Sequence, residues 1–138
     1  MLSTMGLHVL SILHDAPWLR SDFRGHLDER VQRAQLLIAR RYHERINVER
    51  LAGELHIGYS SFRQVFKAQT GLSPKQYQLQ IRLRKAQDFL ANTSKSVEEI
   101  AEILGFDSPY HLSNQFKKQV GFAPQIWRRR LARRTGKR

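Results

Sequence analysis

The sequence contains no cysteine in its 138 residues. This absence excludes disulfides, cysteine-ligated zinc sites and thiol catalysis, and it is compatible with a reducing cytoplasm. The sequence also lacks an apolar run of the ~18 residues that a membrane span requires. The apolar stretch 7–13 is too short for a signal peptide and has no basic leader. We therefore expect a cytoplasmic protein with no membrane partner.

Signals for β-strands are absent as well, since no alternating run of Val, Ile and Thr bounded by turn residues occurs. Proline and glycine are scarce, with four and eight residues, whereas 41% of the residues are hydrophobic. That composition suffices for a folded interior, and the length corresponds to one domain or to two small subdomains that share a core. The sequence predicts an all-α fold.

Motifs for catalysis and for metal binding are missing. The six histidines are scattered and include no His-x3-His pair. Neither a nucleophile–base motif nor a glycine-rich phosphate loop occurs. We expect no enzyme activity, no metal and no cofactor.

Acidic residues are few in the second part of the chain. Residues 1–58 carry eight Arg and seven acidic residues, a balance of +1 (8 − 7), whereas residues 59–138 carry sixteen basic and five acidic residues, a balance of +11 (16 − 5). This asymmetry indicates a polyanionic partner, with nucleic acid favoured over a membrane surface. A basic surface without any partner is the alternative.

The same sequence unit occurs twice, at residues 51–77 and 100–127. The matched residues are Leu51, Ala52, Leu55, Phe66, Lys67, Gln69, Gly71 and Pro74 in the first copy, and Ile100, Ala101, Leu104, Phe116, Lys117, Gln119, Gly121 and Pro124 in the second. Two copies are too few for a solenoid, which needs at least three stacked units. A recognition unit that is used twice fits better.

Apolar periodicity and capping residues predict about seven helices. Asn47, Ser96 and Ser108 are expected N-caps, Gly71 a C-terminal cap, and Ser96 with Glu99 a capping box. Pro74, Pro109 and Pro124 open helices. The predicted helices are 28–43, 48–55, 59–69, 74–91, 97–104, 109–120, and one from 124 into the basic tail.

Each repeated unit reads as a helix-turn-helix, with a short helix, a turn of about four residues and a second helix. Ala52 and Ala101 provide the small side chain that is needed where the two helices cross. The turn requires a residue with positive φ, which Gly105 supplies in the second unit and His56 in the first.

The second helix of each unit has an outward polar face that suits the reading of DNA bases. The candidate base contacts are Ser60, Ser61, Arg63 and Gln64 in the first unit, and Tyr110, His111, Ser113 and Asn114 in the second. The candidate phosphate contacts are Lys67, Lys117, Lys118 and Arg128. Two ordinary solvated helix faces are the alternative, but the pattern occurs twice on a basic chain.

The central helix 74–91 has 18 residues and a length of about 27 Å at ~1.5 Å per residue. Successive major-groove faces of B-DNA lie ~34 Å apart. This helix can therefore hold two recognition helices near one turn of DNA apart within a single chain.

At these positions the chain resembles the DNA-binding domain of the AraC/XylS family of bacterial transcription regulators. The resemblance covers about residues 31–128. It is most specific in GFDSPYHLSNQFKKQVGFAPQIWR, and the central helix matches the family at Arg82, Leu83, Ala86 and Leu90.

The resemblance implies an all-α fold of two helix-turn-helix subdomains joined by a long central helix. It also implies binding to double-stranded DNA and regulation of transcription with RNA polymerase, as an activator more often than as a repressor. Two departures concern the first unit, where Gly58 replaces a capping Ser and His56 replaces the turn Gly. Some DNA-alkylation repair proteins carry a similar domain with an acceptor cysteine, and the lack of cysteine excludes that chemistry here.

The resulting division is an N-terminal extension or linker remnant (1–27), the DNA-binding domain (28–127, with lobes 28–73 and 92–127 around the central helix 74–91) and a basic tail (128–138). In the extension, Leu7, Leu10, Ile12, Leu13 and Trp18 fit a short amphipathic helix, and dimerisation through this segment is one reading. The tail has seven basic residues among eleven, which suits phosphate contact or a disordered end. A nonspecific nucleic-acid-binding or architectural module is the alternative function, but most aromatic residues lie at core spacings, and only Tyr59 and Tyr110 are free for stacking on bases.

Overall fold

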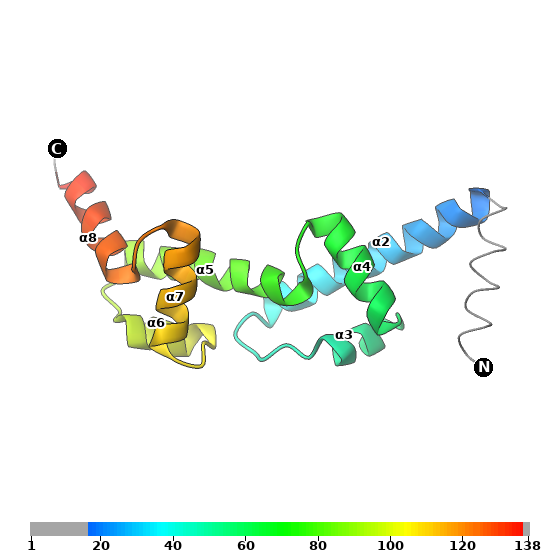
Figure 1. The fold of residues 1–138 in the computed structure, drawn as a ribbon, viewed down its shortest axis with the longest axis horizontal. Helices are drawn as coiled ribbons and strands as arrows, with labels where there is room; N and C mark the ends of the chain where they lie inside the picture. The colour runs from blue at the N-terminus through cyan, green and yellow to red at the C-terminus, as the bar shows by residue number, and fades with distance from the viewer. Residues whose placement is uncertain (1–16, 137–138) are drawn as a thin grey trace.

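The computed structural model describes residues 17–136, which form seven helices and no strand (Figure 1). Within this range the all-α prediction and the number of helices are confirmed. None of these helices combines the length and apolar content needed to cross a membrane. In chain order the helices are α2 Pro17–Arg40, α3 Val48–Glu54, α4 Tyr59–Thr70, α5 Pro74–Asn92, α6 Val97–Leu104, α7 Pro109–Val120 and α8 Pro124–Thr135.

The first and last helices differ from the predicted bounds. Helix α2 begins at Pro17 instead of residue 28 and ends at Arg40 instead of residue 43. The prediction relied on an apolar stripe, which marks only the part of α2 that packs on the lobe, while the blue end of the helix projects beyond it (Figure 1). Helix α8 continues to Thr135, so much of the predicted basic tail is helical. Of the predicted amphipathic segment, residues 7–16 lie outside the described residues.

The helices form two lobes around α5, each with its own hydrophobic core. The first lobe contains α2, α3, α4 and the start of α5, and the second contains the rest of α5 with α6, α7 and α8 (Figure 1). The first core consists of Val31, Ala34, Ile38, Val48, Leu51, Ala52, Leu55, Phe62 and Phe66. The second consists of Leu83, Ala86, Leu90, Val97, Ile100, Ala101, Leu104, Phe106, Leu112 and Phe116.

The predicted N-caps are confirmed. The side chains of Asn47, Ser96 and Ser108 each accept a hydrogen bond from the backbone N–H three residues later, at 2.9, 3.2 and 3.1 Å. The reciprocal capping box, however, is formed at Ser73 and Gln76, at the start of α5, and not at Ser96. The exposed Glu99 carboxylate is already solvated, so a bond back to the Ser96 N–H adds little free energy.

The turn of each unit has the predicted left-handed residue, with φ of 55° at His56 and 81° at Gly105. Both turns are held by an arginine of the preceding long helix. Arg30 Nη1 donates to the His56 carbonyl at 3.3 Å, and Arg82 Nη1 donates to the Gly105 carbonyl at 3.1 Å. The structural duplication therefore extends beyond the sequence repeat. Helix α2 supplies the arginine that binds the turn of the first lobe, and α5 supplies the corresponding arginine for the second lobe.

Candidate nucleic-acid interface

The two recognition helices are α4 and α7, and each is fixed by an aromatic core. Phe62 and Phe66 in α4, like Phe116 in α7, are fully buried. The Phe66 ring meets Tyr77 of α5 edge to face at 5.4 Å, and Phe116 meets Trp127 of α8 in the same way at 5.7 Å. Such aromatic contacts fix the rotation of each helix about its axis, and hence the direction of its outer face.

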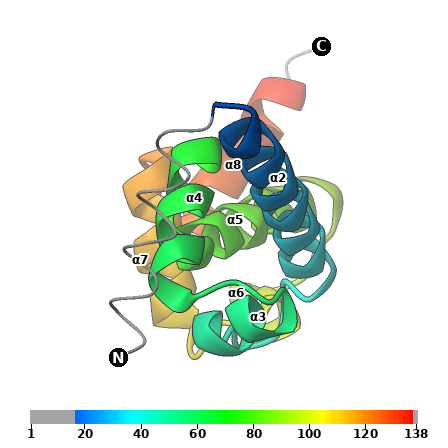
Figure 2. The same ribbon diagram turned by 90° about the vertical axis from the view of Figure 1, so that its right-hand side faces the viewer.

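The outer faces of α4 and α7 lie on the same side of the molecule. Seen along the long axis, both helices lie on one side of α5, with α2 on the other (Figure 2). Both recognition helices therefore lie on one side of the molecule, an arrangement that the sequence alone does not establish.

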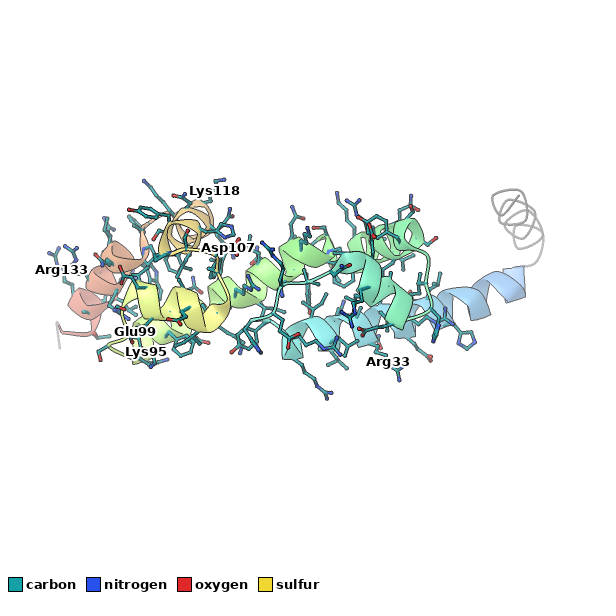
Figure 3. All side chains as sticks on the ribbon, turned by 90° about the horizontal axis from the view of Figure 1, so that it is seen from below. Arg33, Lys95, Glu99, Asp107, Lys118 and Arg133 are labelled. Carbon is teal, nitrogen blue, oxygen red and sulfur yellow. The ribbon has the colours of Figure 1, made fainter. Side chains whose placement is uncertain are left out.

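On α4, all the predicted contact residues are exposed: Ser60, Ser61, Arg63, Gln64 and Lys67. On α7, the predicted residues Tyr110, His111, Asn114, Lys117 and Lys118 are exposed, while Ser113 is half-buried. Lys118 projects outward at the α7 edge, whereas the labelled Arg33 of α2 lies at the opposite edge (Figure 3).

The Arg63 side chain is oriented by Tyr59, one helical turn earlier. Arg63 Nη1 donates to the Tyr59 hydroxyl at 3.4 Å, and the guanidinium lies 5.5 Å from the centre of the ring. Tyr59 is 40% exposed. The sequence prediction treated this tyrosine only as an available aromatic, although its i, i+4 spacing to Arg63 signals the contact.

On α7, His111 and Tyr110 differ in how firmly they are held. The His111 ring meets Phe106 edge to face at 5.4 Å, so it rests on the second core. Tyr110 is 81% exposed, the most exposed of the large hydrophobic residues in the described part of the chain. An exposed aromatic ring of this kind is available for contact with the methyl group of thymine or with sugar.

Helix α8 adds polar residues beside the α7 face. A shallow hollow of about 450 Å³ is lined by Tyr110 and Ser113 of α7 together with Gln125 and Arg129 of α8. The sequence analysis did not single out Gln125 or Arg129. The sequence does contain a signal for this pair. Gln125 directly follows Pro124, which opens α8, and Arg129 follows one helical turn later, so the two side chains lie on the same face of the helix.

Arg128 occupies a different place from the other predicted phosphate contacts. Its Nε donates to the Leu90 carbonyl at 3.0 Å, and its Nη2 donates to the Thr93 carbonyl at 3.3 Å. These bonds satisfy carbonyls at the C-terminal end of α5, where a cation is also favoured by the helix dipole. Arg128 therefore has a structural role, and its contact with phosphate stays a prediction that needs the remaining nitrogen, Nη1.

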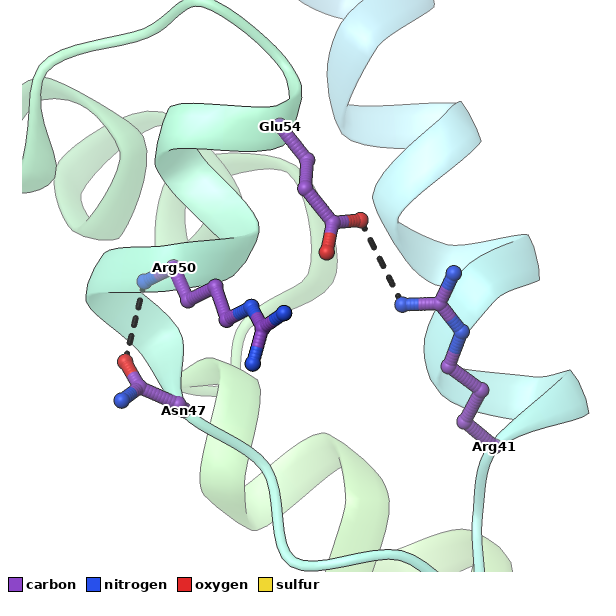
Figure 4. A network of polar contacts seen from close by, with 4 residues as sticks. All are labelled: Arg41, Asn47, Arg50 and Glu54. Carbon is purple, nitrogen blue, oxygen red and sulfur yellow. Dashed lines mark hydrogen bonds and ion pairs between the residues drawn. The ribbon is translucent and has the colours of Figure 1, made fainter.

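Polar side chains of the first lobe connect the segment after α2 with α3 and cap the start of α3. Arg41, just after α2, forms an ion pair with Glu54 at the end of α3 at 3.3 Å, and Asn47 caps the start of α3 (Figure 4). The ion pair is partly exposed and contributes little stability by itself. It links the segment after α2 to the end of α3. Within the described residues, no group of three or more His, Asp or Glu side chains is placed to hold a metal ion.

Residues 51–130 match a family model described as a helix-turn-helix domain. The match spans more than half of the chain and contains both recognition helices. The chain belongs to the AraC/XylS family of transcription regulators.

Solved AraC-type structures have the same fold. The DNA-binding domain of AdpA, solved with a target DNA, has a TM-score of 0.72 and 29% identity, over 78% of this chain and 97% of that chain. An AraC-type regulator from Chromobacterium violaceum has a TM-score of 0.69 and 26% identity, over 76% of this chain and 94% of that chain. The likeness extends over at least three quarters of this chain and over most of each of these two structures.

Curated AraC-type relatives are longer proteins. The MmsAB operon regulatory protein of Pseudomonas aeruginosa is 29% identical over 91% of this chain and 40% of its own length. The transcriptional activator RhaS of Escherichia coli is 28% identical over 77% of this chain and 39% of its own length. The chain therefore spans about two fifths of the length of these relatives.

Proposed function

We propose that this chain binds a bipartite, non-palindromic site on double-stranded DNA by placing α4 and α7 in adjacent major grooves. The supporting observation is that two recognition helices on one side of α5 present different side chains. Helix α5 has 19 residues. Its length of about 28 Å at ~1.5 Å per residue is close to the ~34 Å repeat of the major groove.

The proposed roles follow the chemistry of the exposed side chains. Arg63 suits guanine, Gln64 and Asn114 suit adenine, and serine accepts either base. Lys67 and Lys117, farther along their helices, suit phosphate. The proposed base contacts are Ser60, Ser61, Arg63, Gln64, Tyr110, His111, Ser113 and Asn114, and the proposed phosphate contacts are Lys67, Lys117, Lys118 and Arg128.

In the cell, we propose that the chain activates transcription in the cytoplasm together with RNA polymerase. The support is that RhaS is named a transcriptional activator and that the MmsAB relative regulates an operon. In vitro transcription from a bound promoter tests the sign of regulation. A fall in transcript yield on addition of the protein would make the chain a repressor.

We further propose residues 28–127 as the DNA-binding unit, preceded by an extension that dimerises the chain. Sedimentation of the full chain against a chain that lacks the whole extension, residues 1–27, tests the second part. A monomer in both cases contradicts dimerisation through this segment.

The decisive experiment for DNA binding is selection from randomised duplexes, followed by gel-shift titration with nonspecific competitor. We expect enrichment of two unlike half-sites about one helical turn apart. Equal affinity for every duplex would reject sequence-specific binding and favour the nonspecific nucleic-acid-binding alternative.

A further inference from the structure

The two lobes share one helix but no hydrophobic core. The core residues of the first lobe and those of the second form separate clusters. A continuous helix such as α5 bends gently, so it does not by itself fix the angle between the two lobes. Another contact between the lobes is needed to hold α4 and α7 in register on DNA.

A buried arginine of α5, Arg82, makes that contact, and the buried Gln78 of the same helix bonds the loop that Arg82 holds. Arg82 Nε donates to the Tyr42 carbonyl at 2.6 Å, Nη2 to the Glu44 carbonyl at 3.0 Å, and Nη1 to the Gly105 carbonyl at 3.1 Å. Gln78 Nε2 donates to the Glu44 carbonyl at 2.7 Å. We name Arg82 and Gln78 the interlobe clamp, because Arg82 joins the 41–46 loop of the first lobe to the α6–α7 turn of the second, and Gln78 bonds the same loop to α5.

Burial of the charged Arg82 side chain carries a desolvation penalty. Arg82 is 9% exposed, and burial lowers the pKa of its guanidinium from the usual value, while the nearby Asp107 acts in the opposite direction. Hydrogen bonds from a charged donor are about twice as strong as neutral ones, so three carbonyls compensate for the lost solvation. No buried side-chain nitrogen or oxygen among the described residues lacks a partner.

The loop of the first lobe is also pressed against the second lobe. The Tyr42 side chain packs on the second core, and the Lys85 ammonium lies 4.4 Å from the centre of its ring. At Gly105, an added Cβ would lie 2.1 Å from the His43 carbonyl oxygen. This close approach leaves the loop little freedom to shift relative to the second lobe.

Arg30 of the first lobe and Arg82 both bind the turn of a helix-turn-helix, but only Arg82 also joins the two lobes. Arg30 makes the matching bond to the His56 carbonyl, but it is exposed and its bond stays within one lobe. The bonds from Arg82 to Tyr42 and Glu44 have no such counterpart and cross between lobes.

We propose that Arg82 and Gln78 set the spacing and rotational phase of the two DNA half-sites that the chain accepts. One inserted base pair moves a half-site by ~3.4 Å and rotates it by about 35°. If the angle between the lobes is fixed, the two recognition helices cannot both reach the shifted half-sites, and affinity falls. If the angle is free to change, both helices still bind and affinity is largely kept. This inference rests on the proposed bipartite binding.

A measurement without DNA tests the clamp directly. Because the chain has no cysteine, spin labels can be placed at Glu49→Cys and Glu98→Cys, which are exposed in the first turns of α3 and α6. We expect a narrow distance distribution that broadens in Arg82→Lys, since lysine lacks the planar set of donors. Arg84→Lys, at an exposed position of the same helix, keeps the narrow distribution. An unchanged distribution in Arg82→Lys overturns the proposal.

The second measurement is affinity for selected duplexes whose spacer is lengthened or shortened by one or two base pairs. We expect the parent chain to lose affinity about tenfold or more per base pair and Arg82→Lys to lose about threefold or less, with affinity for a single half-site unchanged. Equal losses in both chains overturn the proposal. If Arg82→Lys does not fold, Gln78→Met is measured in its place; because it frees the 41–46 loop from one bond and leaves Arg82 intact, its loss per base pair is expected to lie between those of the parent chain and Arg82→Lys, and a loss equal to that of the parent chain overturns the proposal. A parent chain without any spacing preference rejects the bipartite binding itself, while the spin-label distances still report on the clamp.

Discussion

Gly105 and Gly121 both adopt left-handed backbone, with φ of 81° and 95°, but their surroundings differ. An added Cβ at Gly105 would lie 2.1 Å from the His43 carbonyl oxygen, whereas nothing lies within 4 Å at Gly121. We expect Gly121→Ala to lower the free energy of unfolding by about 1–2 kcal/mol through backbone strain alone. Gly105→Ala is expected to cost about 3 kcal/mol or more, because the 41–46 loop that the clamp holds must also move.

Urea unfolding followed by circular dichroism measures this difference. Gly121→Ala is the matched control, since it carries the same substitution in the same backbone region. Equal losses of stability in the two variants would contradict the close approach at Gly105.

Arg63 is the side chain for which the strongest effect on base preference is expected. Arg63→Ala should cost about 1–3 kcal/mol of binding free energy and relax the preference at one base pair, because a guanidinium recognises guanine through two hydrogen bonds. Titration of duplexes that carry each base at that position measures the change. Arg33→Ala, on the opposite edge of the molecule (Figure 3), removes the same charge and should leave the preference intact. Uniform weakening by Arg63→Ala would reassign this residue to phosphate contact.

At the scale of the helices, the start of α4 is weaker than the start of α7. Gly58 provides no side-chain cap, whereas the Ser108 hydroxyl accepts from the His111 N–H at 3.1 Å. Gly58 has extended backbone that serine adopts readily, and nothing lies within 4 Å of an added Cβ. We expect Gly58→Ser to raise the free energy of unfolding by about 0.5–1 kcal/mol through a new cap and a less flexible unfolded chain.

Ser108→Ala is the converse variant and should lose about 1 kcal/mol. Both are measured by thermal and urea unfolding. A loss of stability in Gly58→Ser would show that the α3–α4 turn requires glycine there for a reason other than capping.

The helices were predictable where local chemistry determines them. Caps, helix-opening prolines and the two turns each depend on only a few neighbouring residues. The observed bounds of α3, α4, α6 and α7 therefore agree closely with the prediction. The true start of α2 was missed because the prediction followed an apolar stripe that begins at Val31. The placement of the capping box was missed because Glu99 stays in water while Gln76 bonds back to Ser73.

At the candidate interface, the outward residues were predictable from periodicity, but their partners were not. The attachment of Arg128 to the end of α5 and the clamp role of Arg82 depend on contacts 23 to 40 residues apart in the chain. No local pattern encodes such contacts. Tyr59 is the exception, because its spacing to Arg63 was visible in the sequence.

At the scale of the whole molecule, simultaneous use of both lobes has a measurable salt signature. Each phosphate contact that is made releases condensed counterions and adds about 0.9 to the slope of log affinity against log salt concentration. If α4 and α7 occupy adjacent grooves together, Lys67→Ala and Lys117→Ala should each lower that slope by about 0.9. The double variant should then lower it by about 1.8, because the two residues lie in separate lobes and act independently.

Gel-shift titration of the selected duplex at several salt concentrations measures these slopes. Arg40→Ala, which removes an exposed charge at the end of α2, is the control and should leave the slope unchanged. If only one lobe occupies DNA at a time, one of the two lysine variants has the same salt slope as the parent chain. The double variant then has the same slope as the remaining single variant. Additive losses are therefore expected only when one chain spans both grooves, because a phosphate contact changes the slope only in the complex that contains it.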